Sequence, residues 1–203
     1  MLFGLALLPS RPDQERLIEF QRRHRALLPE PVLGLDQNVP HLSVLQCPFR
    51  EELLNPAALN LLASRVLPFR PSQRPIFTHA YYQPLGRIFA GVSLAGWDRK
   101  LQQEALIALE PLIDCSRIDR SGLGALNQPE RANQERYGYR FVGESYRPHI
   151  TLGATDHRFL DPGLMEDFEA QFTGTPIDFT RLAFYRSGAF GSAQEIIASH
   201  TFR

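Results

Sequence analysis

Two short stretches of this chain follow one pattern: Pro40-His41-Leu42-Ser43-Val44-Leu45 and Pro148-His149-Ile150-Thr151-Leu152-Gly153. Each reads proline, histidine, apolar residue, hydroxyl residue, apolar residue. Side chains two positions apart share one face of a β-strand. The pattern therefore predicts two strands, each presenting a histidine and a hydroxyl on one face and apolar side chains to a core. The preceding prolines lack a backbone donor and suit the first position of a strand.

The composition places the chain among ordinary globular proteins. Its 203 residues suit one domain or two lobes that share a core. With 22 basic and 22 acidic residues the formal net charge is zero, which argues against a general nucleic-acid coat. All basic residues except Lys100 are arginines, so a small local patch that binds phosphate through bidentate contacts is compatible with this balance.

The sequence also indicates a compartment. Cys47 and Cys115 form neither a metal-ligand spacing nor a disulfide framework, so we expect free thiols in a reducing cytosol. The apolar run at 2–8 is too short to span a membrane and lacks the basic start of a signal peptide. We expect this run to be the first strand of a cytoplasmic protein that has no membrane partner.

Hydrophobic periodicity predicts an α+β chain whose two halves repeat the order strand, helix, motif strand, helix, hairpin. The expected helices cover 12–28, 56–66, 97–113 and 162–172, and the expected hairpins pair 76–83 with 87–94 and 178–186 with 193–202. The expected architecture is one two-lobed, pseudo-twofold duplicated domain over 1–203, with antiparallel sheets lining a central cleft and helices outside. Residues 1–83 carry the first motif and 84–203 the second.

One segment does not fit this repeat. Residues 116–136 are rich in Arg, Asn, Gln and Gly and show little periodicity. We expect an insertion there, either at the rim of the cleft in contact with substrate or as a disordered decoration. A short strand is expected after it, from Tyr137 to Val142.

The paired motifs closely resemble those of the two-histidine (2H) phosphoesterases. That family includes cyclic nucleotide phosphodiesterases and the RNA 2′,3′-cyclic phosphodiesterases once called 2′-5′ RNA ligases. The likeness covers both motifs and the order of elements along nearly the whole chain. It departs from the family after the second motif, where some relatives carry an arginine or an aromatic residue and this chain has Gly153-Ala154-Thr155.

The chemistry of the motif residues agrees with the resemblance. Opening a cyclic phosphodiester needs one proton removed from water and one delivered to the departing ribose oxygen. Histidine can do either near neutrality because its unperturbed pKa is about 6.5. We expect His41 and His149 to serve as this pair and Ser43 and Thr151 to hydrogen-bond the phosphate oxygens, with no metal and no cofactor. The resemblance favours His149 as base and His41 as acid, whereas the residues alone leave that assignment open.

Other residues could contact the substrate. Tyr82, Tyr185 and Arg186 lie on the repeated hairpin strands and could bind a base or a phosphate, although strand aromatics are more often part of a core. The remaining histidines make no metal-binding spacing on a helix: His24, His79, His157 and His200.

The leading hypothesis is therefore a monomeric, metal-independent phosphodiesterase that opens the 2′,3′-cyclic phosphate of an RNA end or a nucleotide. One alternative is a module that binds a nucleotide or RNA phosphate without turnover. Another is RNA ligation, which as the reverse reaction would use the same residues.

Overall fold

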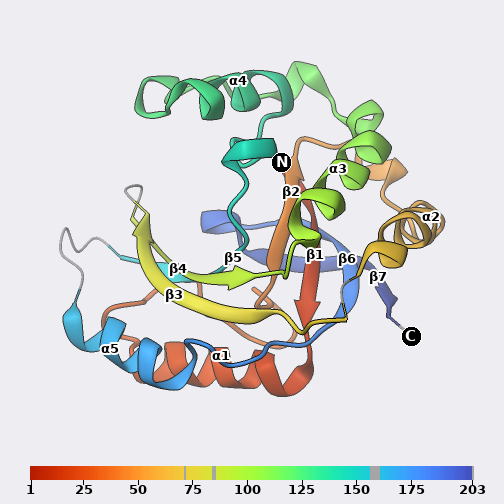
Figure 1. Cartoon of the computed structure of the whole chain (residues 1–203). Coiled ribbons are helices and arrows are strands. Elements are labelled where there is room, and N and C mark those ends of the chain that lie inside the picture. Colours follow the sequence, from red (N-terminus) through yellow and green to blue (C-terminus); the bar gives the residue numbers. More distant parts are fainter. Residues whose placement is uncertain (71, 84–85, 156–160, 203) are drawn as a thin grey trace.

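The computed structural model describes residues 1–70, 72–83, 86–155 and 161–202, and these residues form an α+β fold of five α-helices and one seven-stranded antiparallel sheet (Figure 1). The strands are β1 (Phe3–Pro9), β2 (Leu42–Cys47), β3 (Ile76–Gln83), β4 (Arg87–Ser93), β5 (His149–Ala154), β6 (Phe179–Ser187) and β7 (Ala193–Thr201). The helices are α1 (Arg11–Arg23), α2 (Pro56–Val66), α3 (Trp97–Leu109), α4 (Gln128–Tyr137) and α5 (Pro162–Gln171). His157, and Pro84 and Leu85 in the turn of the first hairpin, lie outside the described residues.

The two motif strands stand side by side at the centre of the sheet. Its strand order is β3-β4-β5-β2-β1-β6-β7. β2 and β5 are joined by one residue pair, Leu42 with Ile150. The separate sheets expected from the sequence are therefore one sheet, which this narrow junction holds together.

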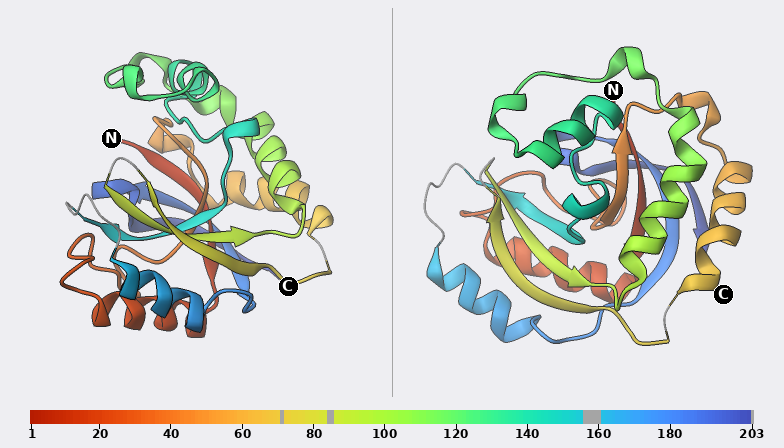
Figure 2. Two further views of the ribbon diagram at one scale, coloured as in Figure 1. Left: turned by 60° about the vertical axis from the view of Figure 1, so that its left-hand side comes forward. Right: turned by 45° about the horizontal axis from the view of Figure 1, so that its top comes forward.

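Helices from each half pack across that junction. α1 follows β1 in the chain but contacts β5, and α3 follows β4 but contacts β2. α2 packs on β6 and β7, and α5 packs on β3. Figures 1 and 2 show α1 and α5 side by side against one part of the sheet, while α4 stands apart on the opposite side of the molecule.

β1 is buried on both faces, and its side chains alternate between two clusters. Phe3, Leu5 and Leu7 belong to the large core that also contains the buried faces of the helices. Ala6 and Leu8 point the other way, into a small cluster with side chains of the neighbouring strands. This alternation follows from the two-residue period of a strand. Gly4 and Ala6 are small, so this second face leaves room for the ring of Tyr185, which belongs to the small cluster.

The strand expected from Tyr137 to Val142 is absent from the structure. Tyr137 ends α4, and Gly138 closes the helix in a left-handed conformation, with φ of 70°. The next four residues are buried without strand pairing. Their carbonyls are satisfied by side chains instead: the Asn133 amide donates to the Arg140 and Val142 oxygens at 3.0 and 2.9 Å. A side chain thus replaces the ladder that a strand would have required.

The segment 116–136 is structured, so the disordered alternative is wrong. It contains the end of one 3-10 helix (Cys115–Arg117), a second one (Leu123–Ala125) and most of α4. Asn127 caps α4 by accepting a hydrogen bond from the Glu130 amide, and the Glu130 carboxylate accepts one from the Asn127 amide in return. This capping box stabilises the first turn of α4. Only Tyr137 of α4 is buried, so the sequence shows no apolar periodicity that predicts this helix.

Gly4 provides a test of how tightly the small face of β1 is packed. A Cβ at Gly4 would lie 2.1 Å from Cε1 of Tyr185, which is fully buried. Because that ring has no space to move into, Gly4→Ala should lower the free energy of unfolding by about 1–3 kcal/mol. Denaturant titration measures this. Gly124→Ala, where nothing lies within 4 Å, is the matched control and should stay within about 0.5 kcal/mol of the parent protein. Equal stability of both variants would contradict the packing described.

Candidate active site

The four motif side chains gather where β2 and β5 pair. Leu42 and Ile150 form that pair and are both fully buried in the large core. Their neighbours on each strand therefore face the other way, out of that core. Continuing the antiparallel register from this pair places the motif residues in two facing pairs: His41 opposite Thr151, and Ser43 opposite His149.

Both motif strands carry an irregularity at the same place. The register between β1 and β2 shifts so that Val44 is the extra residue on β2. The register between β4 and β5 shifts so that Leu152 is the extra residue on β5. Each follows directly after the hydroxyl residue of its motif, Ser43 or Thr151. Bulges bend a strand and re-aim its side chains, and they are enriched beside active sites.

The two imidazoles are held in the same way. Nδ1 of His41 lies 2.8 Å from the Val39 carbonyl oxygen, and Nδ1 of His149 lies 2.6 Å from the Arg147 carbonyl oxygen. A carbonyl oxygen can only accept, so in each ring Nδ1 carries a hydrogen and donates it. Nε2 of each neutral ring is then the atom that can take up a proton. The same bond to the residue two positions earlier orients both histidines.

Aromatic rings enclose both histidines. The Phe89 ring stacks on His149, with 3.8 Å between centroids and 23° between planes, and Phe141 meets the same imidazole edge-on at 5.5 Å. Tyr185 lies against His41 with centroids 4.7 Å apart. The histidines are accordingly only 5% and 8% exposed. Little water reaches either ring, which disfavours the protonated form of each.

Burial lowers the pKa of His41 and of His149 to about 4. For His41, hydrogen bonding to the backbone of Val39 and Gly191 offsets part of this effect. For His149, the charges of His41, Arg87 and Arg140 lower the pKa further. The two histidines therefore sense each other's charge, and both are neutral at pH 7 in the protein without ligand.

Tyr185, predicted to bind substrate, has a different place. Its side chain is fully buried, and its hydroxyl lies 2.9 Å from the Ser43 hydroxyl. Burial raises the pKa of Tyr185 well above its ordinary value, so the phenol stays protonated. Tyr185 therefore positions Ser43 and packs against His41 inside the protein, and its ring is not exposed for stacking on a nucleobase.

Tyr82 and Arg186 were also predicted to bind substrate, and the structure places neither in the cavity beside the motifs. Tyr82 lies on β3, at one edge of the sheet, and packs against the large core. Arg186 forms ion pairs with Glu51 and Glu195. Two glutamates thus already neutralise its charge, and Arg186 is not among the residues that line the cavity.

A cavity of about 430 Å³ lies beside the motif strands. Ser43, His149 and Thr151 line it, whereas the buried His41 is not among the lining residues. The segment expected to be an insertion does reach it, through residues between Asp119 and Gln134. Part of 116–136 therefore lies beside the cavity, while its origin as an insertion and its contact with substrate stay predictions.

Sequence reasoning missed Arg87 and Arg140, which also line the cavity. Arg87 opens β4, and Arg140 follows α4 in the buried segment without strand pairing. One signal was available: Arg140 stands between Tyr139 and Phe141, so a charge interrupts an apolar run. Nothing comparable marks Arg87, because the first residue of a hairpin strand is commonly polar.

Other groupings of polar side chains lie elsewhere in the described chain. His24 contacts Asp167 at 2.7 Å, and His200 contacts Asn60 at 2.8 Å, neither in the cavity. Among the described residues there is no group of three or more His, Cys, Asp or Glu side chains able to hold a metal ion. Within the same residues no helix has the length and apolar character needed to cross a membrane.

Comparison with solved structures finds proteins of similar fold. The fold is similar to the crystal structure of TT0787 of Thermus thermophilus, with a TM-score of 0.54 and 18% sequence identity, over 100% of this chain and 98% of that chain. At this identity the likeness concerns the fold alone. No protein-family model and no curated protein matches the chain.

The buried neutral histidines make stability depend on pH. In the folded protein the pKa of His41 and His149 is about 4, below the ordinary 6.5. As the pH falls below about 6.5 the unfolded chain binds protons that the folded chain refuses until about 4. The free energy of unfolding should thus fall by on the order of 2 kcal/mol per histidine from about pH 7 to about pH 5.

Urea denaturation at both pH values measures this difference. The double variant His41→Asn/His149→Asn should lose much less stability between about pH 7 and about pH 5 than the parent protein does. His79→Asn, which replaces an exposed histidine on β3, is the control and should behave as the parent. An equal loss in the parent and the double variant would show that other groups carry the effect.

Proposed function

We propose that this protein is a phosphodiesterase that opens a 2′,3′-cyclic phosphate on an RNA end or a nucleotide, without a metal. The observation that carries the proposal is the meeting of two matched strands, each offering a histidine held through Nδ1 and a hydroxyl beside it. The resemblance of both motifs to the 2H phosphoesterases supports the same activity. The fold comparison adds nothing about the reaction.

The proposed chemistry divides two proton transfers between the two histidines. Nε2 of the neutral histidine, His149 by resemblance, takes a proton from water as the water oxygen attacks phosphorus. The bond from phosphorus to one ribose oxygen breaks, and protonated His41 delivers its proton to that oxygen. Ser43 and Thr151 donate hydrogen bonds to the nonbridging oxygens, where negative charge gathers. The product is a phosphate monoester.

The site must acquire its acid when substrate binds, because both histidines are neutral without it. A cyclic phosphodiester carries one negative charge. Placed in the cavity beside the two buried imidazoles, that charge favours binding of a proton by the pair, and in the proposed scheme His41 carries it. A buried histidine with a lowered pKa is also a strong acid once protonated, which suits delivery of a proton to the leaving oxygen.

The duplicated, two-lobed arrangement is part of the proposal. From the centre outward the sheet reads β5, β4, β3 on one side and β2, β1, β6 on the other. Each motif strand follows its neighbour in the sheet through a helix, α1 or α3, that packs on the opposite motif strand. The matching bulges and matching Nδ1 bonds give further support.

Replacement of either histidine should remove turnover and keep the fold. In His41→Asn or His149→Asn, the asparagine amide can still donate to the carbonyl that Nδ1 bonds, but no group replaces Nε2. We expect kcat on a nucleoside 2′,3′-cyclic phosphate to fall by roughly a hundredfold to ten-thousandfold. EDTA should leave the activity of the parent protein unchanged.

His79→Asn serves as the control, since that side chain is exposed on β3. Substantial activity in either motif variant, or loss of activity with EDTA, would overturn the mechanism. A parent protein that binds cyclic nucleotides and cyclic-phosphate oligonucleotides but releases no product from any of them would support the binding-module alternative instead.

The pH profile tests the need for two histidines. kcat/KM reports the free protein, in which both pKa values are near 4, so its bell should have an alkaline limb below the ordinary histidine pKa of about 6.5. kcat reports the complex, where the phosphate charge raises the pKa of the acid, so its alkaline limb should lie at higher pH. The limbs belong to the coupled pair rather than to either residue.

Initial rates from about pH 4 to about pH 9, which spans the lowered and ordinary histidine values, give both profiles. A kcat/KM that rises to an alkaline plateau would mean that only one proton transfer matters, and the two-histidine scheme would be wrong.

A further inference from the structure

The cavity holds two positive charges that the proposed mechanism does not use. Arg87 and Arg140 both line it. Arg140 is only 8% exposed, and its guanidinium lies over the Phe141 ring at 4.5 Å. Arg87 is half-buried, and its Nε is shielded from solvent. Burying charges in this way is unfavourable unless something compensates them.

No carboxylate of the described residues forms an ion pair with either arginine, and the buried Nε of Arg87 has no hydrogen-bond acceptor there. Burial lowers the pKa of both, and the charge of Arg140 lowers the pKa of Arg87 further. Asp119, an acidic residue of the lining, accepts a hydrogen bond from the Ser121 amide at 2.8 Å. Surface arginines such as Arg74, by contrast, do pair with a carboxylate.

On the strands, the backbone of Arg87 lies beyond that of the motif residues. On β4, Phe89 pairs with Thr151, and Arg87 comes two residues further along the same face. Two residues of a strand span roughly 7 Å. The backbone of Arg87 is therefore displaced along the sheet from that of Thr151 and His149, while its charge still acts on the His149 imidazole. Arg140 comes from the segment after α4, next to the Phe141 ring that contacts His149.

We propose that Arg87 and Arg140 form a second phosphate subsite, which binds a phosphate on the 5′ oxygen of the nucleotide whose cyclic phosphate is opened. The inference rests on the proposed function and deepens it. Two guanidinium groups that line one cavity, and whose charges act on each other, match the oxygens of one phosphate, since each can bond in a bidentate fashion. The preferred substrate is then a cyclic-phosphate end that carries a neighbouring phosphate rather than a cyclic mononucleoside.

That second phosphate has two sources, a phosphodiester inside an RNA chain or a 5′-phosphomonoester, and three substrates distinguish them. They are adenosine 2′,3′-cyclic phosphate, the same compound with a 5′-phosphate, and a dinucleotide ending in the cyclic phosphate. The parent protein should prefer at least one of the two phosphate-bearing substrates by tenfold or more in kcat/KM. Preference for the dinucleotide alone identifies an RNA end.

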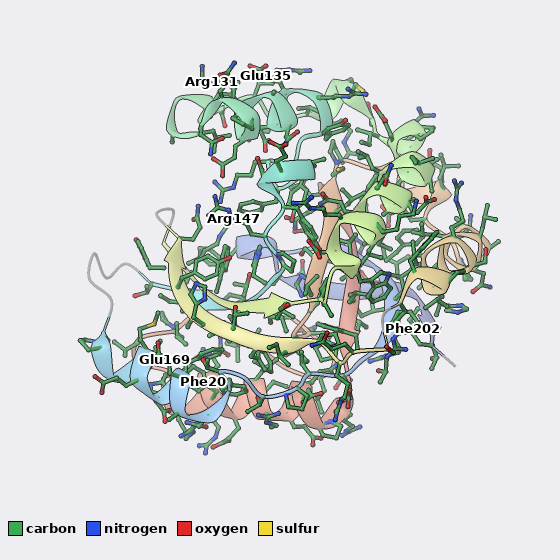
Figure 3. All side chains as sticks on the ribbon, in the orientation of Figure 1. Phe20, Arg131, Glu135, Arg147, Glu169 and Phe202 are labelled. Carbon is green, nitrogen blue, oxygen red and sulfur yellow. The ribbon has the colours of Figure 1, made fainter. Side chains whose placement is uncertain are left out.

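In Arg87→Ala and Arg140→Ala this preference should shrink toward one. Arg87→Lys and Arg140→Lys should restore part of it, because lysine keeps the charge without the fork. Arg131→Ala removes a positive charge from the exposed side of α4 and is the matched control (Figure 3). Equal losses on all three substrates would place the arginines at the reacting phosphate and overturn the proposal, as would a parent protein with no preference.

Binding separates this proposal from the proposed function. Calorimetry with adenosine 2′-phosphate and adenosine 2′,5′-bisphosphate needs no turnover. The bisphosphate should bind the parent at least tenfold more tightly, and the difference should disappear in the two alanine variants, whose Tm should not fall. A tenfold difference without turnover of any substrate would sustain the subsite and reject the phosphodiesterase. Turnover without that difference, or a lowered Tm, would reject the subsite.

Discussion

The pairing of Leu42 with Ile150 is the constraint on which the rest of this structure depends. It joins the two parts of the sheet, and both side chains are fully buried. Because alternate residues of a strand face opposite ways, burying this pair turns the histidines and hydroxyls of both motifs to the other face. A slip of one residue would send the polar side chains into the large core, so the register and the site are specified by the same burial.

The site contains several buried polar and charged groups whose desolvation lowers the free energy of unfolding. Two imidazoles are almost fully buried, and two arginines stand nearby without carboxylate partners in the described part of the chain. Desolvation keeps the histidines neutral and weakens the charged state of the arginines. An anion bound in the cavity would stabilise the charged forms of the histidines and of the arginines at the same time. Groups that lower stability in the free protein can thus be the groups that bind the ligand, a conflict that is usual at functional sites.

Much of the secondary structure could be predicted from local patterns, and the errors have identifiable causes. The helix expected at 56–66 is α2 with the same bounds, and both expected hairpins are present. The strand expected from Tyr137 to Val142 failed because Gly138 ends α4 and the Asn133 side chain takes the backbone bonds of the following segment. α4 itself was missed because a polar helix held by a capping box has no apolar period to detect.

The sequence alone determined which side chains the two motif strands present together, since a period of two residues is a local property and proline marks where each strand starts. The tertiary structure decided which other side chains surround these motif residues. Tyr185 was expected to contact substrate and instead supports Ser43 from within the protein. Arg186 is taken by two glutamates, while Arg87 and Arg140 reach the cavity. One arginine cannot be told from another along the chain, because whether it finds a carboxylate depends on contacts between residues far apart in sequence.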